Sequence, residues 1–554
     1  MTTKQNITLI QRFDSKDGKL VVAHILVAFI ALLIGGIAGL LQTMVKSGTI
    51  KLPYSIGYYE LLTAHGVLMA IVFTTYFIIG FLYSGVSYTL GGKLLPVVHR
   101  MGWTGFGLMT AGTVLGVAMV LTGKASVLYT FYAPLKASPY FYIGLALLVV
   151  GSWISGWGLF YQYKYWKKTN PGKLSPLFAY MAVVTFLMWQ IATIGVAAEV
   201  LIQLIPWSFG WVETINVMLS RTLFWYFGHP LVYFWLMPAY ICWYVIIPKI
   251  IGGKIYSDAL ARLSFILLLL FSIPVGFHHQ LMEPGISSFW KYVQVVLTFM
   301  VVIPSLMTAF SLFATFEING RAKGAKGLFG WVKVLPWKDV RFFAPFMGML
   351  IFIPAGAGGL INASNQMNAV VHNTLWVTGH FHLTVATSVA LTFFGITYWL
   401  LPVVTGRILT LRMNKWGIIQ TIVWCVGMFF MSGAMHLVGL FGAPRRTAFT
   451  TYENQADAAN WMPYYVFMAI GGMVLFIGVL MMVVNVVAML RAPKGVEAYP
   501  LGEAMESAEA TPVYLDRWRI WIALSVLLIL FAYTIPLIDM ISSSVPGSKG
   551  FITW

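Results

Sequence analysis

The sequence predicts an all-α polytopic membrane protein. Of its 554 residues, 59% are hydrophobic and only 9% are charged, whereas a soluble globular domain carries about 25% charged residues. So few charges do not cover a water-facing surface, and apolar runs of about 20 or more residues recur along the chain. The runs lack the alternation of outer-membrane strands, so we expect helices that face lipid.

Thirteen apolar runs follow one another, and each is long enough to cross a bilayer once. The first is too long for the apolar core of a cleaved signal peptide, so we expect it to stay as a span. No internal repeat is visible. The predicted spans are 20–45, 61–84, 102–121, 140–163, 177–205, 219–248, 260–280, 289–316, 342–364, 370–402, 416–441, 462–490 and 518–542.

The Lys and Arg residues between the spans predict the orientation. With a cytoplasmic N-terminus, the inner segments hold 26 of the 35 basic residues, and the bias recurs from loop to loop. About 13 spans then place the C-terminus outside. The predicted division is a cytoplasmic segment at 1–19, a transmembrane domain at 20–542 and an outer tail at 543–554.

The net charge of +18 is interpreted as a result of this topology and of contact with anionic lipid headgroups. We therefore expect membrane lipid as a partner and no nucleic acid. The two cysteines, Cys242 and Cys425, both lie in apolar stretches. They predict neither a disulfide framework nor a metal site built from cysteine.

Seven histidines share one predicted depth in the outer half of the membrane. A histidine inside a span is costly unless it has a partner, and lone ones such as His24 and His436 are interpreted as contacts between helices. Neutral imidazole suits iron and copper, so a single layer of histidines indicates metal or haem ligation. The layer consists of His65, His229, His278, His279, His372, His380 and His382.

Two of these histidines, His380 and His382, are expected to point to opposite sides of their helix. They are two positions apart, which is about 200° around an α-helix. One helix could therefore hold one haem on each side.

A second group predicts a site for one metal ion. His278 and His279 are about 100° apart on a helix, and Pro274 can distort the helix one turn earlier. The pair could bind one metal ion together with a third histidine, for which His229 is the candidate. Tyr233 lies four residues later on the same helical face as His229.

The segments around these histidines resemble subunit I of the haem–copper respiratory oxidases. Gly228-His229-Pro230-Leu231-Val232-Tyr233 is similar to the family motif Gly-His-Pro-X-Val-Tyr. Three further segments of this chain are similar to other motifs of the family. They are Phe277-His278-His279, Val370-Val371-His372 with Gly379-His380-Phe381-His382, and Pro444-Arg445-Arg446. Tyr129-Thr130-Phe131-Tyr132 and Phe271-Ser272-Ile273-Pro274-Val275-Gly276 look most like the B-type branch, the ba-type oxidases.

The resemblance implies a proton-translocating terminal oxidase that reduces O2 to water in a prokaryotic cytoplasmic (plasma) membrane, with the transmembrane domain as its catalytic part. It implies a low-spin haem, expected to be haem b, a high-spin haem of a- or o-type and one copper ion. The electron-input site would need paired cysteines that this chain lacks. We therefore expect a subunit II to carry it, with cytochrome c or quinol as the electron donor.

Carried over by motif, the haem contacts fall on five residues. His65 and His382 are the expected axial ligands of the low-spin haem, and His380 is the expected axial ligand of the high-spin haem. Arg445 and Arg446 are expected to pair with haem propionates, because arginine binds carboxylates bidentately.

The copper ligands implied by the resemblance are His229, His278 and His279. Tyr233 is the expected catalytic tyrosine, which the family joins covalently to the first copper ligand.

One departure concerns proton supply. A-type relatives often carry a Glu where this chain has Leu231, so we expect their carboxylate-dependent channel to be absent.

A second departure lies beside the haem propionates. B-type relatives carry an Asp at the position of Asn368, four residues before His372. The amide puts in doubt any proton-loading role that the family assigns to that carboxylate. Asn373 and His372 are expected to belong to the same polar layer.

Two rows of hydroxyl groups predict a proton route from the cytoplasm. Their steps of three, four and seven residues keep one helical face, and the tyrosine row is roughly 16 Å long. The alternative is that each hydroxyl makes a packing hydrogen bond between helices. The rows are Tyr233, Tyr240 and Tyr244 on one span, and Ser305, Thr308 and Ser311 on another.

Two other functions remain open from the sequence. A nitric oxide reductase of the same superfamily would share the haem ligands, but it typically has iron in place of copper and lacks the linked tyrosine, so Tyr233 favours oxygen chemistry. A secondary transporter with thirteen spans would often show inverted repeats, and it would give no reason for one layer of histidines.

Overall fold

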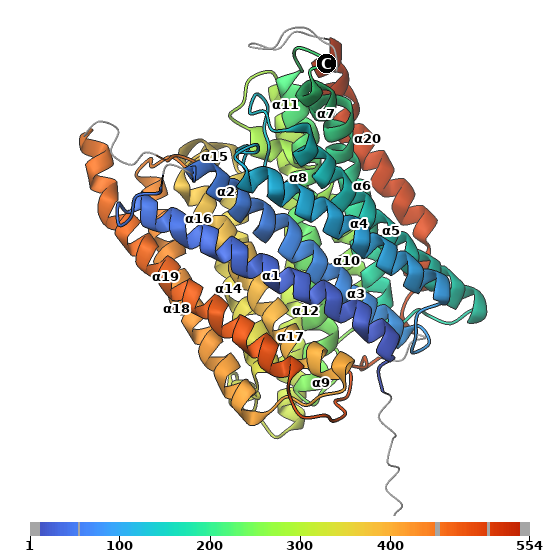
Figure 1. The fold of residues 1–554 in the computed structure, drawn as a ribbon. Helices are drawn as coiled ribbons and strands as arrows, with labels where there is room; N and C mark the ends of the chain where they lie inside the picture. Colours follow the sequence, from blue (N-terminus) through green and yellow to red (C-terminus); the bar gives the residue numbers. More distant parts are fainter. Residues whose placement is uncertain (1–11, 54–55, 449–454, 507–509, 543–554) are drawn as a thin grey trace, which may run out of the picture.

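The fold is a bundle of long helices (Figure 1). The computed structural model describes residues 12–53, 56–448, 455–506 and 510–542. All the regular secondary-structure elements in these ranges are helices. Within them, 12 helices are long and apolar enough to cross a membrane, which confirms the predicted all-α membrane fold. The predicted tail at 543–554 and most of the predicted N-terminal segment, 1–11, lie outside the described residues.

The helices that cross as single α-helices are α1 (Ser15–Lys46), α4 (Pro96–Leu121), α5 (Pro139–Thr169), α14 (Val340–Ala363), α18 (Leu411–Leu440), α19 (Ala456–Leu490) and α20 (Trp518–Ser542). The composite crossings are α2 (Tyr58–Gly66), η1 (Val67–Phe73) and α3 (Thr74–Thr89); α6 (Leu177–Ala198), η2 (Glu199–Leu204) and α7 (Ile205–Phe209); α8 (Val217–Ile241), η3 (Cys242–Ile246) and α9 (Ile247–Ile250); α11 (Ser288–Met300) and α12 (Val302–Ala322); and α16 (Leu375–Leu383), η5 (Thr384–Val389) and α17 (Ala390–Thr405). Shorter elements are α10 (Asp258–Ser272), η4 (Gly276–Gln280), α13 (Gly330–Lys333), α15 (Asn365–Val371) and η8 (Val513–Asp516).

The predicted span at 260–280 is present as two shorter pieces. The α-helix α10 ends at Ser272, and the 3-10 helix η4 follows from Gly276 to Gln280. Pro274 lies in the break, as expected for a residue that lacks a backbone donor. At about 1.5 Å per α-helical residue and about 2 Å per 3-10 residue, the pieces and their link together cover roughly one membrane thickness. α1 begins at the end of the bundle opposite to the one at which α20 ends (Figure 1).

The three crossings that carry His65, His229 and the pair His380 and His382 form the centre of the bundle. Of the most apolar 18-residue window in each, 83%, 89% and 100% is buried, against 22% in α20. Apolar faces on these helices therefore pack against protein and not lipid, which is the setting in which polar side chains are tolerated inside a membrane.

Small residues allow close contact between outer helices. A Cβ atom on Gly112 of α4 would lie 2.4 Å from the carbonyl oxygen of Gly144 on α5, so no larger residue fits between the two backbones. Packing through small residues is a common means of helix association in lipid.

Turns of π-helix interrupt three of the central crossings next to the polar residues. η1 begins two residues after His65, η5 begins two residues after His382, and η3 contains Tyr244. Such turns inside α-helices are frequent at functional sites.

Candidate metal centre

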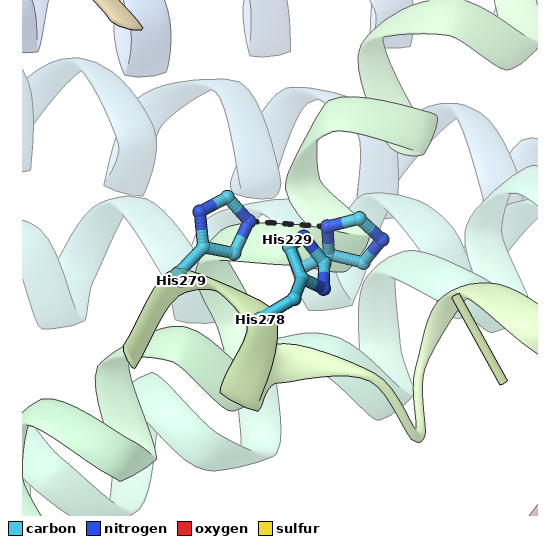
Figure 2. A group of neighbouring side chains, drawn as sticks. All are labelled: His229, His278 and His279. Carbon is cyan, nitrogen blue, oxygen red and sulfur yellow. Dashed lines mark hydrogen bonds between the residues drawn. The ribbon is translucent and has the colours of Figure 1, made fainter. Parts of the chain in front are cut away.

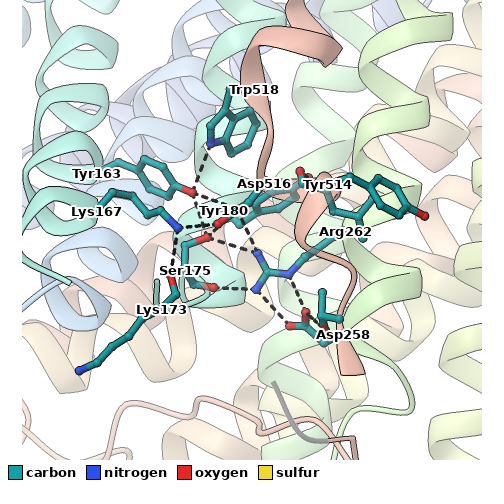
Figure 3. A network of polar contacts seen from close by, with 12 residues as sticks. Tyr163, Lys167, Lys173, Ser175, Tyr180, Asp258, Arg262, Tyr514, Asp516 and Trp518 are labelled. Atoms are coloured by element: carbon teal, nitrogen blue, oxygen red, sulfur yellow. Dashed lines mark hydrogen bonds and ion pairs between the residues drawn. The ribbon is translucent and has the colours of Figure 1, made fainter. Parts of the chain in front are cut away.

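Three histidines converge in the core. His229 comes from α8, and His278 and His279 come from η4 (Figure 2). One ring nitrogen from each lies within 4.8 Å of the other two, and His229 Nδ1 is 3.2 Å from His279 Nε2. His229 Nε2 is buried without a hydrogen-bond partner among the described residues. Three convergent imidazoles of this kind suit copper, zinc or iron.

The break between α10 and η4 aims the two neighbouring histidines at one point. His278 Nδ1 lies 3.0 Å from Thr298 Oγ1 of α11, which leaves Nε2 as the nitrogen available to a metal. The ring of His279 stacks on Trp225, with centroids 3.9 Å apart and planes at 3°. Contacts of this type fix the orientation of metal-binding histidines.

The histidine on α8 belongs to a row of three ring residues. Trp225, His229 and Tyr233 follow one another at steps of four, so they share one helical face. The Tyr233 ring centroid lies 5.0 Å from that of His229. Trp225 was not among the predicted site residues, although the spacing of four would have identified it.

His65 and His382 face each other from different crossings. Their ring centroids are 6.1 Å apart and their planes differ by 8°. His65 Nδ1 is hydrogen-bonded to the Gly35 carbonyl at 2.9 Å, and His382 Nδ1 to the Thr378 carbonyl at 2.8 Å. Each histidine therefore keeps Nε2 for a metal, with its ring held by the backbone.

A cavity contains both of these rings. His65, His382, Arg445 and Arg446 line it together with mostly apolar side chains. A Cβ atom on Gly39, which also lines the cavity, would lie 2.6 Å from His65 Nδ1. Glycine is therefore required there for the imidazole to approach α1.

His380 lies on the other side of its helix. It does not line the cavity that His382 lines, and it is close enough to His278 and His279 to interact with them electrostatically. Its ring stacks on Trp376 with centroids 5.8 Å apart, and its buried Nδ1 has no partner in the described part of the chain. The structure therefore brings His380 toward the three-histidine cluster and His382 toward His65.

Positive charge without an anionic partner lines part of the cavity. Arg445 Nη2 donates to Asn373 Oδ1 at 3.0 Å, but Arg445 Nε and Arg446 Nη2 are buried without a partner among the described residues. Burial and the charge of Arg446 lower the pKa of Arg445 to about 10. Arg446 and Arg221 lie against the Tyr132 ring, at 5.1 and 4.7 Å from its centroid. Arg221 is already paired with Glu283 at 2.6 Å, so the guanidinium groups of Arg445 and Arg446 are the ones that fit a ligand with carboxylates.

The remaining membrane histidines make local contacts. His24 Nδ1 and His436 Nδ1 are each hydrogen-bonded to a backbone carbonyl four residues earlier in the same helix, at 2.9 and 2.7 Å, whereas we predicted contacts between helices. His372 Nδ1 lies 3.0 Å from Asn368 Oδ1. Burial and the charge of Arg445 lower the pKa of His372 to about 4, so its ring is neutral at pH 7.

The two predicted hydroxyl rows meet. Tyr240 lies near Ser305, and Tyr244 lies near Thr308 and Ser311, although Ser311 Oγ has no hydrogen-bond partner among the described residues. Thr308 Oγ1 also donates to the Pro304 carbonyl at 2.8 Å, which is a bond within α12 and not the bond between helices that the alternative interpretation expects.

A residue outside both rows contacts the tyrosine row. Tyr244 Oη is 3.0 Å from Ser264 Oγ of α10, and Ser264 is fully buried. A single serine in an apolar run gave no periodic signal, so it was missed from the sequence.

Comparisons with known proteins agree with this arrangement. A family model described as cytochrome c and quinol oxidase polypeptide I matches residues 19–474. The chain is 41% identical over 550 residues to cytochrome c oxidase subunit 1 of Thermus thermophilus, covering 96% of both chains. It is 24% identical over 523 residues to the protein of the same name in Thermostichus vulcanus, covering 90% and 88%.

A solved structure has the same fold. It is a cryo-EM structure of a haem–copper terminal oxidase dimer, with 37% identity and a TM-score of 0.89. The match covers 95% of this chain and 93% of the other.

Proposed function

Because the chain belongs to the family of cytochrome c and quinol oxidase polypeptide I, the subunit I of haem–copper oxidases, we propose that it reduces O2 to water at a high-spin haem facing a copper ion, coupled to proton pumping. It is the catalytic subunit of a terminal oxidase and a multi-pass membrane protein. The convergence of His229, His278 and His279 beside Tyr233 is the observation that carries the proposal.

Six histidines would hold the metals. His229, His278 and His279 would bind copper, and His380 would bind the iron of the high-spin haem on the same side. His65 and His382 would bind the low-spin haem from opposite faces, with Arg445 and Arg446 at its carboxylates. When bound, the high-spin haem and the copper supply the open metal positions for oxygen and electrons for the cleavage of the O–O bond.

Tyr233 would hold a proton at its hydroxyl beside the copper ligands. It lies one helical turn from His229, and their ring centroids are 5.0 Å apart. The spacing permits the covalent link between these two side chains that the family forms. The link would fix the phenol close to the metals, where its hydrogen atom can be delivered.

Protons would reach Tyr233 from the cytoplasm along the two hydroxyl rows. The proximity of Tyr240 to Ser305, and of Tyr244 to Thr308 and Ser311, supports a polar path through this part of an apolar bundle. Leu231 leaves no carboxylate at the position where A-type relatives end a second channel. One route would therefore supply both the oxygen chemistry and the pump.

The remaining components follow from the same proposal. The low-spin haem would be haem b and the high-spin haem would be of a- or o-type. A subunit II would carry the electron-input site and receive electrons from cytochrome c or quinol. The N-terminus would face the cytoplasm of a prokaryotic cell, and the metal centres would lie in the outer half of its plasma membrane.

Oxygen uptake by the purified complex tests the proposal. Cytochrome c and a quinol would be offered separately, with a reduced-minus-oxidised spectrum of the same sample. We expect oxygen consumption with one of the two donors, and a spectrum with one low-spin and one high-spin haem. Reduction of nitric oxide without oxygen uptake, in a sample with both haems, would assign the chain to the other branch of the superfamily.

A further inference from the structure

Lys46 is a buried cation at the end of α1. It is the last residue of that helix, and its exposed fraction is 3%. A lysine at the end of a transmembrane helix normally extends its ammonium group to the headgroups and water. Lys46 does not, so something inside the protein must compensate its charge.

The described contacts of Lys46 are all with neutral groups. Its Nζ donates to the backbone oxygen and to Oγ1 of Thr447, both at 2.9 Å, and lies 5.2 Å from the centroid of the Tyr465 ring. None of the ion pairs in the described part of the chain includes Lys46. A buried ammonium group without an anion is costly, so an acidic ligand would complete this site.

The position of Lys46 indicates which ligand this is. Lys46 lines the same cavity as His65, His382 and Arg446, and its partner Thr447 directly follows Arg446 in the chain. The ammonium group and the guanidinium groups of Arg445 and Arg446 therefore line the same cavity in which the two histidines face each other. A lipid phosphate fits less well, because the side chain is closed to the surface.

We infer that Lys46 binds a carboxylate of the group held between His65 and His382, a propionate of the low-spin haem. This rests on the proposed function, which places that haem in the cavity. Reduction adds one negative charge to the haem, and a nearby cation stabilises the reduced form. Lys46 therefore raises the reduction potential of the low-spin haem and favours its acceptance of electrons from the donor.

Redox titration of the intact complex tests this inference. Lys46→Met removes the charge and keeps an unbranched chain, while Lys46→Arg keeps a cation. Lys51→Met is the matched control, because Lys51 is an exposed lysine in the loop after α1. The titration follows the low-spin band, and infrared difference spectra of the same samples follow the propionate carboxylates.

We expect Lys46→Met to lower the equilibrium constant for reduction of the low-spin haem about tenfold, which is about 59 mV for a one-electron couple. Its propionate bands should shift, whereas Lys46→Arg should stay within about threefold and Lys51→Met should match the unaltered complex. If Lys46→Met does not retain its haem, Lys46→Gln takes its place in both measurements.

Two results would overturn the inference. One is an unchanged potential and unchanged propionate bands in a complex that contains both haems. The other is a lower potential without any change in the propionate bands, which would mean that Lys46 acts at a distance. Absence of a two-haem spectrum in the unaltered complex would instead contradict the proposed function. Failure of this inference and failure of the proposed function are therefore distinguishable.

Discussion

His65 and His382 lie with ring centroids 6.1 Å apart and planes only 8° from parallel, although they belong to different crossings. A metal–nitrogen bond is about 2 Å long, so this separation leaves room for one metal ion between the rings. Hydrogen bonds from both Nδ1 positions to backbone carbonyls hold the arrangement.

Removal of either facing histidine should therefore eliminate the low-spin haem. We predict that His65→Ala and His382→Ala each lose the low-spin band in the reduced-minus-oxidised spectrum and lose steady-state turnover, because one axial ligand is gone. His99→Ala is the control, since His99 pairs with Asp17 at 3.1 Å and does not line the cavity that His65 and His382 share. A normal low-spin spectrum in either ligand variant would show that the assignment is wrong.

The three-histidine cluster should bind copper independently of the haems. We predict that His278→Ala and His279→Ala each lose the copper of this subunit while they retain both haems, because two imidazoles do not complete the site. The measurement is the ratio of copper to haem iron, relative to the unaltered complex. Full copper content in both variants would contradict the ligand assignment.

Thr298 should act on copper through His278. Its hydroxyl is the partner of His278 Nδ1 at 3.0 Å, and loss of such a partner typically weakens metal binding by about 10- to 100-fold. We predict that Thr298→Val loses copper to a chelator at least about tenfold more readily, while Thr298→Ser behaves normally. Equal copper retention in the two variants would mean that the hydroxyl does not orient the ligand.

Substitutions in the hydroxyl rows should slow proton uptake and leave folding unchanged. A lone intramembrane hydrogen bond contributes only about 0.6 kcal/mol on average, so Tyr244→Phe and Thr308→Val should retain both haems and copper. We predict that each slows oxygen reduction by at least about tenfold, a barrier increase of roughly 1.4 kcal/mol. The slowing should appear in the steps that take up protons and not in electron transfer between the haems.

Flow-flash absorbance with a pH dye measures both kinds of step in one sample. Ser84→Ala is a useful control, because Ser84 is a buried hydroxyl that is hydrogen-bonded to Tyr499 and lies outside both rows. Near-normal turnover and proton uptake in both route variants would show that protons enter elsewhere.

Helical geometry explains why much of the site was predictable. A separation of two residues sets His380 and His382 on opposite sides of a helix, and the structure has one facing the three-histidine cluster and the other facing His65. The break near Pro274 follows from the chemistry of proline. These features depend only on local spacing, which a sequence displays directly.

Features that depend on tertiary contacts were not predictable. Lys46 looks in the sequence like a lysine that contacts lipid headgroups, and its burial depends on a loop about 400 residues away in the chain. Ser264 contacts the tyrosine row only because α10 packs beside Tyr244. The predicted span at 260–280 differed in form, since hydropathy does not distinguish one continuous helix from the two pieces α10 and η4.

The central claim is that a haem iron bound by His380 faces a copper ion bound by His229, His278 and His279. Infrared spectroscopy of the reduced, carbon monoxide-bound complex at low temperature tests it most directly. We predict that light transfers carbon monoxide from the haem iron to copper, so that a copper-carbonyl band appears as the haem-carbonyl band disappears, and that His278→Ala lacks the copper band. A haem-carbonyl band that bleaches in the unaltered complex without any copper-carbonyl band would contradict the claim.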